Sequence, residues 1–236
     1  MGYERLDKIL SSQLGISRKD VKAAVRRGIA RVNGETVSDP GMQTDPECDS
    51  IVFDGQAVAY KKFVYILMNK PKGVLSASND KNRRTVIDLV PPELRRAGLF
   101  PAGRLDKDTT GLIIITDDGG FAHRMLSPKS GVFKTYRAVL DGAVTEETVR
   151  MFSEGVTLAD GTECRPARLR RLSENTAEVE ICEGRYHQIK RMFGAVGLGV
   201  NELERISVGG LKLPEKLRPG ECVELDGNSL KSVFCK

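Results

Sequence analysis

One segment of this chain reads Gly103-Arg-Leu-Asp-Lys-Asp-Thr-Thr-Gly-Leu-Ile-Ile-Ile-Thr-Asp-Asp118 and joins a polar turn to a short apolar run. The turn carries two carboxylates, Asp106 and Asp108, and the run from Leu112 to Ile115 is followed by the turn-forming residues 117–120. A short apolar run between turn signals is typical of a buried strand. We therefore expect a loop, a buried strand and a loop, with a carboxylate held at the start of the strand by a rigid scaffold. Asp is also common in ordinary solvated turns, so the residues alone leave both interpretations open.

The residues around this segment indicate more strands than helices. Continuous or alternating apolar residues predict strands over 63–68, 134–140 and 177–182, whereas helical spacing occurs over 145–152 and 186–193. The first of these strands is expected to end at the Asn-Lys-Pro-Lys-Gly sequence that follows it. Because strands outnumber helices and do not alternate with them regularly, we predict an α+β domain built on a mostly antiparallel mixed β-sheet flanked by helices.

The first sixty residues read as a separate unit. Leucines and isoleucines at helical spacing over 6–14 predict a helix that Gly15 ends. Ser17, three residues before Asp20, predicts the N-cap of a second helix that runs to about residue 27. Two short strands around an Asn-Gly turn are expected over 31–37. We therefore predict a small domain over 1–60 and a larger one over 61–236.

Basic residues are concentrated in the predicted helices of the small domain. From Arg5 to Arg31 the chain has eight Lys or Arg against two acids, whereas residues 32–54 contain acids but neither Lys nor Arg. Arg18, Lys22 and Arg26 recur every four residues and therefore share one face of the second helix. Such a face is either simply solvated or a surface for a polyanion, and the formal net charge of +5 favours the second only slightly.

The cysteines and histidines predict neither disulfides nor a metal site. Five cysteines are widely separated without a Cys-x-x-Cys pair, and the two histidines, His123 and His187, are far apart in the sequence. The N-terminal residues lack the apolar core of a signal peptide, and no run is long enough to cross a bilayer. We expect a cytoplasmic protein with free thiols.

Three motifs in the larger domain resemble those of RsuA-type RNA pseudouridine synthases, and the resemblance extends over nearly the whole chain. The first is Gly-Arg-Leu-Asp-x-x-Thr-x-Gly-Leu, which begins at Gly103; the others are Lys-Thr-Tyr136 and His-Gln-Ile-Lys190. The resemblance implies that Asp106 is the nucleophilic aspartate and that Tyr136 and Lys190 complete the catalytic set. Without the resemblance, the residues favour interpreting Tyr136 as a half-buried strand residue and Lys190 as a solvated helix charge.

The resemblance also implies roles for these residues. Asp106 would face the electron-poor anomeric carbon of the target nucleotide, and Lys190 would keep that carboxylate charged and oriented. Tyr136 would position the base, Arg104 would fill the gap that the flipped base leaves, and Arg185 would bind substrate. The reaction adds and removes no atoms, so we expect no cofactor and no metal. His187 is expected to be a structural partner.

The small domain resembles the α-L RNA-binding domain first seen in a small-subunit ribosomal protein, over residues 4 to about 58. In that domain the second helix and the loop after it lie along RNA phosphates, so the resemblance assigns RNA binding to five positions. These are Arg18, Lys19, Lys22, Arg26 and Arg27.

The motif around residues 183–193 resembles the branch of the family that acts on 16S rRNA. We therefore expect a monomeric isomerase that converts a specific uridine of 16S rRNA, free or in a small-subunit assembly intermediate, to pseudouridine. A large-subunit rRNA enzyme is the main alternative. A non-catalytic rRNA-binding assembly factor would have no reason to retain all three catalytic motifs, and the basic helix disfavours a small-molecule hydrolase.

Overall fold

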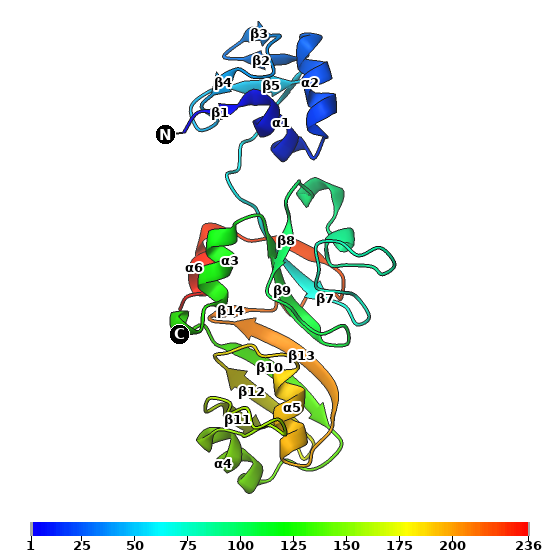
Figure 1. The fold of residues 1–236 in the computed structure, drawn as a ribbon, viewed down its shortest axis with the longest axis vertical. Coiled ribbons are helices and arrows are strands. Elements are labelled where there is room, and N and C mark those ends of the chain that lie inside the picture. Colours follow the sequence, from blue (N-terminus) through cyan, green and yellow to red (C-terminus); the bar gives the residue numbers. More distant parts are fainter. Residues whose placement is uncertain (1, 236) are drawn as a thin grey trace. The chain divides into compact units, whose positions relative to one another are not determined.

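The computed structural model describes residues 2–235, which form two compact units (Figure 1). The first unit holds the residues up to Val64 together with 92–99, and the second holds 65–91 and the residues from Phe100 onward. A single cut after residue 60 therefore does not describe the division in full, because the segment 92–99 returns to the first unit.

Within the described residues, the first unit contains two α-helices, one short 3-10 helix (Pro92–Leu94) and six short strands. Gly15 ends the first helix with a left-handed backbone (φ 66°), and the Ser17 side chain accepts the backbone N–H of Asp20 to begin the second, as predicted. Apolar residues of both helices pack on one sheet of order β3-β2-β5-β6. The elements are β1 Glu4–Arg5, α1 Leu6–Leu14, α2 Arg18–Arg26, β2 Ala30–Val32, β3 Glu35–Val37, β4 Gln43–Thr44, β5 Ile51–Phe53 and β6 Gln56–Ala57.

The second unit is built on a nine-stranded sheet, which confirms the α+β prediction. Seven strands follow the order β11-β12-β10-β13-β9-β7-β15, while β14 pairs with β13 and β8 with β9. Every recorded pairing in this sheet is antiparallel except that of β9 with β13. The elements are β7 Tyr65–Lys70, β8 Phe100–Ala102, β9 Thr110–Thr116, α3 Gly119–Leu126, β10 Lys134–Leu140, α4 Glu146–Glu154, β11 Arg168–Arg171, β12 Thr176–Ile181, α5 Gln188–Ala195, β13 Val200–Val208, β14 Leu211–Lys212, β15 Cys222–Glu224 and α6 Gly227–Ser232.

Several boundaries are displaced by one or two residues from the sequence-based expectation, and two of these differences have a clear physical cause. Strand β7 continues through Lys70 instead of ending before Asn69, because the Lys70 ammonium finds three backbone carbonyls inside the fold. Helix α5 begins at Gln188, two residues later than predicted, because His187 adopts the left-handed backbone conformation (φ 48°) and cannot belong to a right-handed helix.

The two halves of the sheet meet where β9 runs parallel to β13. Only two residue pairs are in register there, Thr110 with Glu204 and Gly111 with Arg205. A Cβ on Gly111 would lie 2.3 Å from the Arg205 carbonyl oxygen, and Gly111 has a φ of +96°. The Arg205 side chain adds a bond across the junction, since its Nε donates to the Leu112 carbonyl at 2.7 Å. The close approach at Gly111 therefore joins the sheet directly beside the turn that carries Asp106.

We predict that Gly111→Ala lowers the free energy of unfolding of the second unit by about 3 kcal/mol or more. The new methyl group forces the two strands apart, and the positive φ strains any residue other than glycine. Gly119→Ala is the matched control, because a Cβ there meets nothing within 4 Å and Gly119 lies at a helix start. Denaturant unfolding with amide exchange in β9 and β13 measures both variants; equal stability of the two would contradict the steric role of Gly111.

Candidate active site and basic surface

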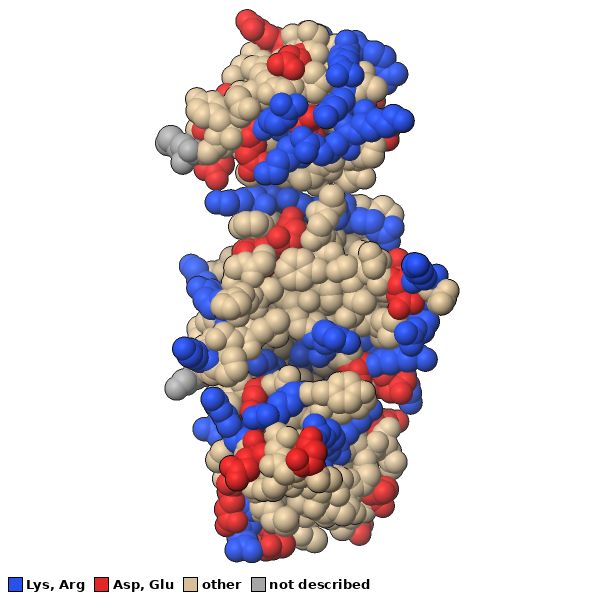
Figure 2. Space-filling model, in the orientation of Figure 1, with Lys and Arg blue, Asp and Glu red and all other residues tan. Residues whose placement is uncertain are grey.

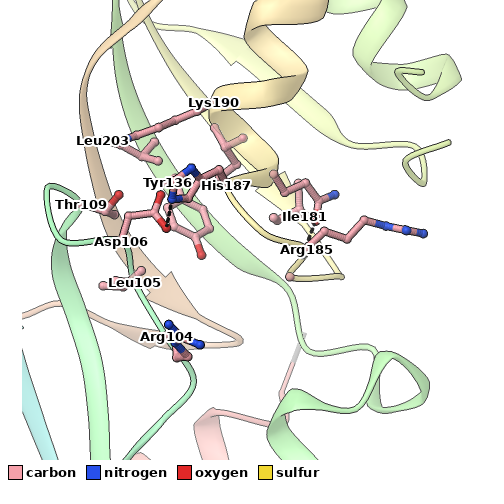
Figure 3. Close-up of a pocket in the computed structure, with 13 residues that line it drawn as sticks. Arg104, Leu105, Asp106, Thr109, Tyr136, Ile181, Arg185, His187, Lys190 and Leu203 are labelled. Atoms are coloured by element: carbon pink, nitrogen blue, oxygen red, sulfur yellow. Dashed lines mark hydrogen bonds and ion pairs between the residues drawn. The ribbon is translucent and has the colours of Figure 1, made fainter. Parts of the chain in front are cut away.

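The structure gathers the sequence-predicted site residues of the second unit around one pocket (Figure 3). Asp106 reaches it from the turn before β9, Tyr136 from β10 and Lys190 from the first turn of α5. Arg104 and Arg185, which are both exposed, lie on the same lining. Residues separated by more than eighty positions in the sequence thus share one small cavity.

The backbone on both sides of Asp106 is held by two side chains, Lys70 at the end of β7 and Ser76 in the segment that follows it. The fully buried Lys70 donates from Nζ to the carbonyls of Pro71, Lys107 and Thr109, at 3.1, 3.0 and 2.9 Å. Ser76 donates to the Leu105 carbonyl at 2.8 Å and accepts the Leu105 N–H at 3.1 Å. The turn is therefore fixed before any ligand arrives, which is the condition for a preorganised carboxylate.

Lys70 places a buried positive charge next to the backbone of the turn that carries Asp106. Burial lowers the pKa of Lys70 to about 8, and the nearby carboxylates of Asp108 and Asp106 act in the opposite direction. The ammonium form uses all three of its N–H donors on the three carbonyls, so it is the form that the site fits at neutral pH. Lys70 was not singled out in the sequence analysis, because a lysine that follows an apolar run there reads as the start of a loop.

His187, rather than Lys190, makes the polar contact to Asp106. The His187 Nε2 atom lies 3.3 Å from the Asp106 Oδ1 atom, and Figure 3 shows Lys190 extending from α5 without such a contact. Within residues 2–235, no ion pair of 4.0 Å or less joins Lys190 to Asp106. His187 has a left-handed backbone immediately before the helix, and its ring, not the Lys190 ammonium, contacts the carboxylate. The sequence-based expectation that His187 is a structural partner stays a prediction; the structure adds that the residue it contacts is Asp106.

Tyr136 lies on the buried face of β10, as the alternating pattern predicted. Its register partners are Val179 on β12 and Arg205 on β13. The Arg205 guanidinium carbon is 6.0 Å from the centre of the Tyr136 ring. Arg205 is itself buried, so the arginine of the β9–β13 junction also lies beside the pocket tyrosine. No local pattern in β13 marks this arginine, because its burial depends on a strand far away in the sequence.

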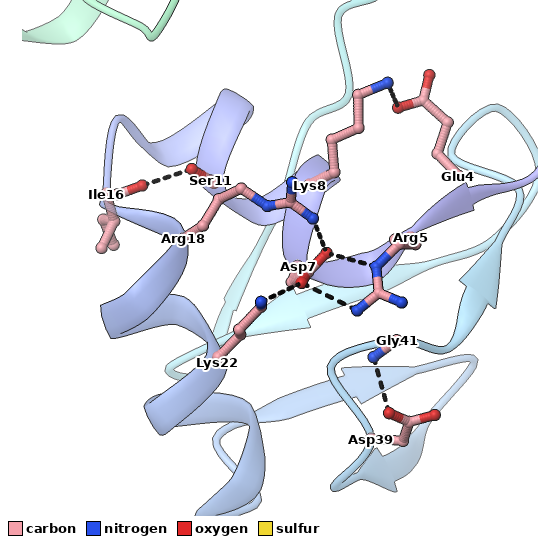
Figure 4. A network of polar contacts seen from close by, with 10 residues as sticks. All are labelled: Glu4, Arg5, Asp7, Lys8, Ser11, Ile16, Arg18, Lys22, Asp39 and Gly41. Atoms are coloured by element: carbon pink, nitrogen blue, oxygen red, sulfur yellow. Dashed lines mark hydrogen bonds and ion pairs between the residues drawn. The ribbon is translucent and has the colours of Figure 1, made fainter.

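The basic surface of the first unit is organised around a buried acid, Asp7 (Figure 4). Arg5 contacts both carboxylate oxygens at 3.2 Å, Arg18 lies 2.8 Å from Oδ1 and Lys22 lies 3.6 Å from Oδ2. Burial by itself would raise the pKa of Asp7, but hydrogen bonds and charge from Arg5 and Arg18 outweigh it and lower the pKa to about 2. Asp7 was missed because an acid in the first turn of a helix normally lies in solvent.

Two of the five predicted RNA-binding residues therefore have an internal partner. Arg18 and Lys22 remain about half exposed while they pair with Asp7, and Lys19, Arg26 and Arg27 are exposed. Figure 2 shows Lys and Arg side chains gathered on one face of this unit. The buried Asp7 carboxylate thus fixes the positions of Arg18 and Lys22 within this basic surface.

The structure places no group of three or more His, Cys, Asp or Glu where they would hold a metal ion, as far as residues 2–235 are concerned. All five cysteines are free. In the same range, no helix is long and apolar enough to cross a membrane.

Comparison with known families assigns both units. The sequence pattern of the S4 domain matches residues 4–49, and that of RNA pseudouridylate synthase matches residues 64–195.

Individual proteins resemble the chain over nearly its full length. A Bacillus subtilis (strain 168) protein named as an uncharacterized RNA pseudouridine synthase is 41% identical over 96% of both chains. The ribosomal small subunit pseudouridine synthase A of Escherichia coli (strain K12) is 38% identical over 97% of this chain and 99% of its own. A crystal structure of a pseudouridylate synthase superposes with a TM-score of 0.69 at 35% identity, covering 97% of this chain and 99% of that chain.

We predict that Asp7→Asn destabilises the first unit in a pH-dependent way. The folded pKa of about 2 is below the ordinary 3.8, so the ionised acid stabilises the fold above about pH 4, and this contribution disappears as the pH falls towards 2. The difference in free energy of unfolding between wild type and Asp7→Asn should therefore shrink over that interval. Glu4→Gln, which alters a largely solvent-accessible pair between Lys8 and the half-buried Glu4, should cost less than about 1 kcal/mol. Denaturant unfolding at stepped pH is the measurement; a constant difference down to pH 2 would contradict the pairing.

Proposed function

The chain belongs to the RNA pseudouridylate synthase family, whose members are isomerases acting on RNA. We propose that it converts a specific uridine of small-subunit (16S) rRNA to pseudouridine, and that Asp106 is the catalytic carboxylate. The observation that carries this proposal is the rigid turn that presents Asp106 to a pocket shared with Tyr136 and Lys190.

The reaction breaks the bond between N1 of uracil and C1′ of ribose and makes a bond between C5 and C1′. The proton on C5 is lost and N1 gains one, so atoms and electrons balance without an oxidant, a reductant or a metal. Detaching the base leaves C1′ electron-poor, and a carboxylate meets that demand as it does in glycosidases. Asp106 serves either by bonding to C1′ or by assisting formation of a glycal intermediate; both routes need a fixed carboxylate facing the sugar.

Tyr136 and Lys190 complete the proposed catalytic set. Tyr136 is buried with its ring on the pocket, where it positions the detached uracil and relays the proton that leaves C5. Lys190 brings a cation to the same cavity and offsets the negative charge that Asp106 and the RNA concentrate there. The His187 contact orients the carboxylate in the free enzyme.

The target uridine has to leave its stack to reach Asp106, at a cost of a few kcal/mol. Arg104, exposed two residues before Asp106, fills the gap that the base leaves. Arg185, exposed on the opposite segment of the lining, binds a phosphate of the substrate strand.

The first unit supplies affinity for rRNA through phosphate contacts. Its exposed basic residues lie on a folded surface, and the Asp7 contacts hold two further cations half exposed on the same unit. The small-subunit assignment rests on the 38% identical E. coli protein, which matches over nearly all of both chains. We propose a monomer that acts in the cytoplasm, on 16S rRNA or a small-subunit assembly intermediate.

We predict that Asp106→Asn abolishes release of tritium from rRNA labelled at C5 of uridine, while fold and RNA affinity stay unchanged. Asn keeps the size of the side chain but removes the charge that stabilises the electron-poor sugar. Asp108→Asn is the matched control: this exposed acid lies in the same turn but does not line the pocket, and the variant should retain most activity. Near wild-type release by Asp106→Asn would refute the assignment.

We predict that replacing Lys19, Arg26 and Arg27 together with Ala weakens rRNA binding and flattens its salt dependence. Each lost phosphate contact lowers the slope of log K against log salt by about 0.7–0.9. These positions are chosen because Arg18 and Lys22 also hold Asp7, so their removal would mix binding with stability. Arg150→Ala, which removes an exposed cation from α4, should leave the slope unchanged. An unchanged slope in the triple variant would remove this surface from the binding site.

A further inference from the structure

Tyr186 is an aromatic residue exposed beside the pocket. Its side chain is 76% exposed, the highest value among the exposed large hydrophobic residues that the structure describes. The ring lies flat on that of His187, with centroids 3.8 Å apart and planes 18° apart. One face of Tyr186 is therefore backed by a second ring, and the high exposure leaves the other face to solvent.

The stacked pair is directly connected to the candidate active site. Its two sequence neighbours, Arg185 and His187, both line the pocket, and the His187 Nε2 atom is the one that contacts Asp106 at 3.3 Å. The left-handed backbone at His187 sets the orientation of the pair immediately before α5. A molecule that covers Tyr186 therefore lies next to whatever occupies the pocket.

Core packing does not account for this ring, since so little of Tyr186 is buried. Its surroundings are suited to RNA rather than to an apolar protein partner. Arg185 and Lys190 line the neighbouring pocket, and Arg191 reaches back to donate to the Tyr186 carbonyl at 3.5 Å. A flat aromatic face beside cations is the arrangement on which unpaired bases stack while phosphates are neutralised.

We propose that Tyr186, backed by His187, is the stacking site for an unpaired RNA base immediately next to the target uridine. This inference rests on the proposed function, because it requires a flipped uridine at Asp106. Flipping removes one stacking partner from each neighbouring base; Arg104 fills the gap beside one of them, and the Tyr186 ring replaces the lost partner of the other. The base stacked on Tyr186 would also restrict the motion of the Tyr186–His187 pair and so stabilise the contact between the His187 ring and Asp106.

The test is a cycle of protein and RNA changes in the full-length chain. The RNA is a 16S rRNA fragment that contains the target uridine in its unmodified form. It is made intact, or with an abasic nucleotide on the 5′ or the 3′ side of that uridine. Equilibrium binding and single-turnover tritium release are measured for wild type, Tyr186→Ala and Tyr186→Phe. Tyr3→Ala is the matched control, because Tyr3 is 70% exposed and is not part of the pocket lining.

On intact RNA, Tyr186→Ala should weaken binding by about five- to hundredfold, the range expected for one lost base stack, whereas Tyr186→Phe should stay near wild type. With the abasic nucleotide on one of the two sides, the Tyr186→Ala penalty should fall to within about twofold. The effect of Tyr3→Ala should not depend on the abasic nucleotide.

A Tyr186→Ala penalty that is absent, or that is equally large on all three RNAs, would overturn the stacking site. Failure of the proposed function gives a different result, since wild type would then bind RNA without releasing tritium. Failure of the Tyr186 inference alone leaves tritium release by wild type intact and removes only the dependence of the Tyr186→Ala penalty on the abasic nucleotide.

Discussion

The close approach of β9 and β13 at Gly111 is the constraint on which the second unit depends. It is the one parallel pairing recorded in the sheet and connects β10, β11 and β12 on one side to β7, β8 and β15 on the other. Tyr136 and α5 belong to the first of these halves, and the Asp106 turn belongs to the second. A side chain at Gly111 would separate the strands and move Asp106 away from its pocket partners. The geometry of the site thus follows from a backbone contact that only glycine permits.

Two buried charges complete this organisation, one in each unit. Lys70 has only backbone carbonyls as hydrogen-bond partners, so its charge serves to hold the turn before β9. Asp7 has three cationic partners, so its charge serves to gather basic side chains on the surface of the first unit. Removing either group would leave its partners without the bonds that now satisfy them, a loss that is costly inside a protein. The buried base Lys70 thus positions the turn that carries an acid, Asp106, and the buried acid Asp7 positions basic side chains on the surface of the first unit.

Local patterns in the sequence were enough to predict much of this molecule. The alternation in 134–140, the apolar run after Gly111 and the Ser17 cap each depend on near neighbours, and each was found as predicted. The prediction was weaker where distant segments decide the outcome. Lys70 is buried because carbonyls almost forty residues away accept from it, and the His187 ring faces Asp106 because of a backbone conformation that no adjacent glycine signals. The sequence motifs identified Asp106, Tyr136 and Lys190, which line one pocket in the structure. That His187 is the residue in contact with Asp106 could be seen only in the structure.

We propose that this chain modifies one uridine of small-subunit rRNA and does so through Asp106. The most direct measurement maps pseudouridines by carbodiimide-blocked reverse transcription in cells that lack the gene and are supplied with either wild type or Asp106→Asn. One 16S rRNA position should be modified with wild type and unmodified with Asp106→Asn, while all other positions stay the same. Equal modification of 16S rRNA in both strains, or a lost site only in large-subunit rRNA, would refute the assignment of Asp106 and of its substrate.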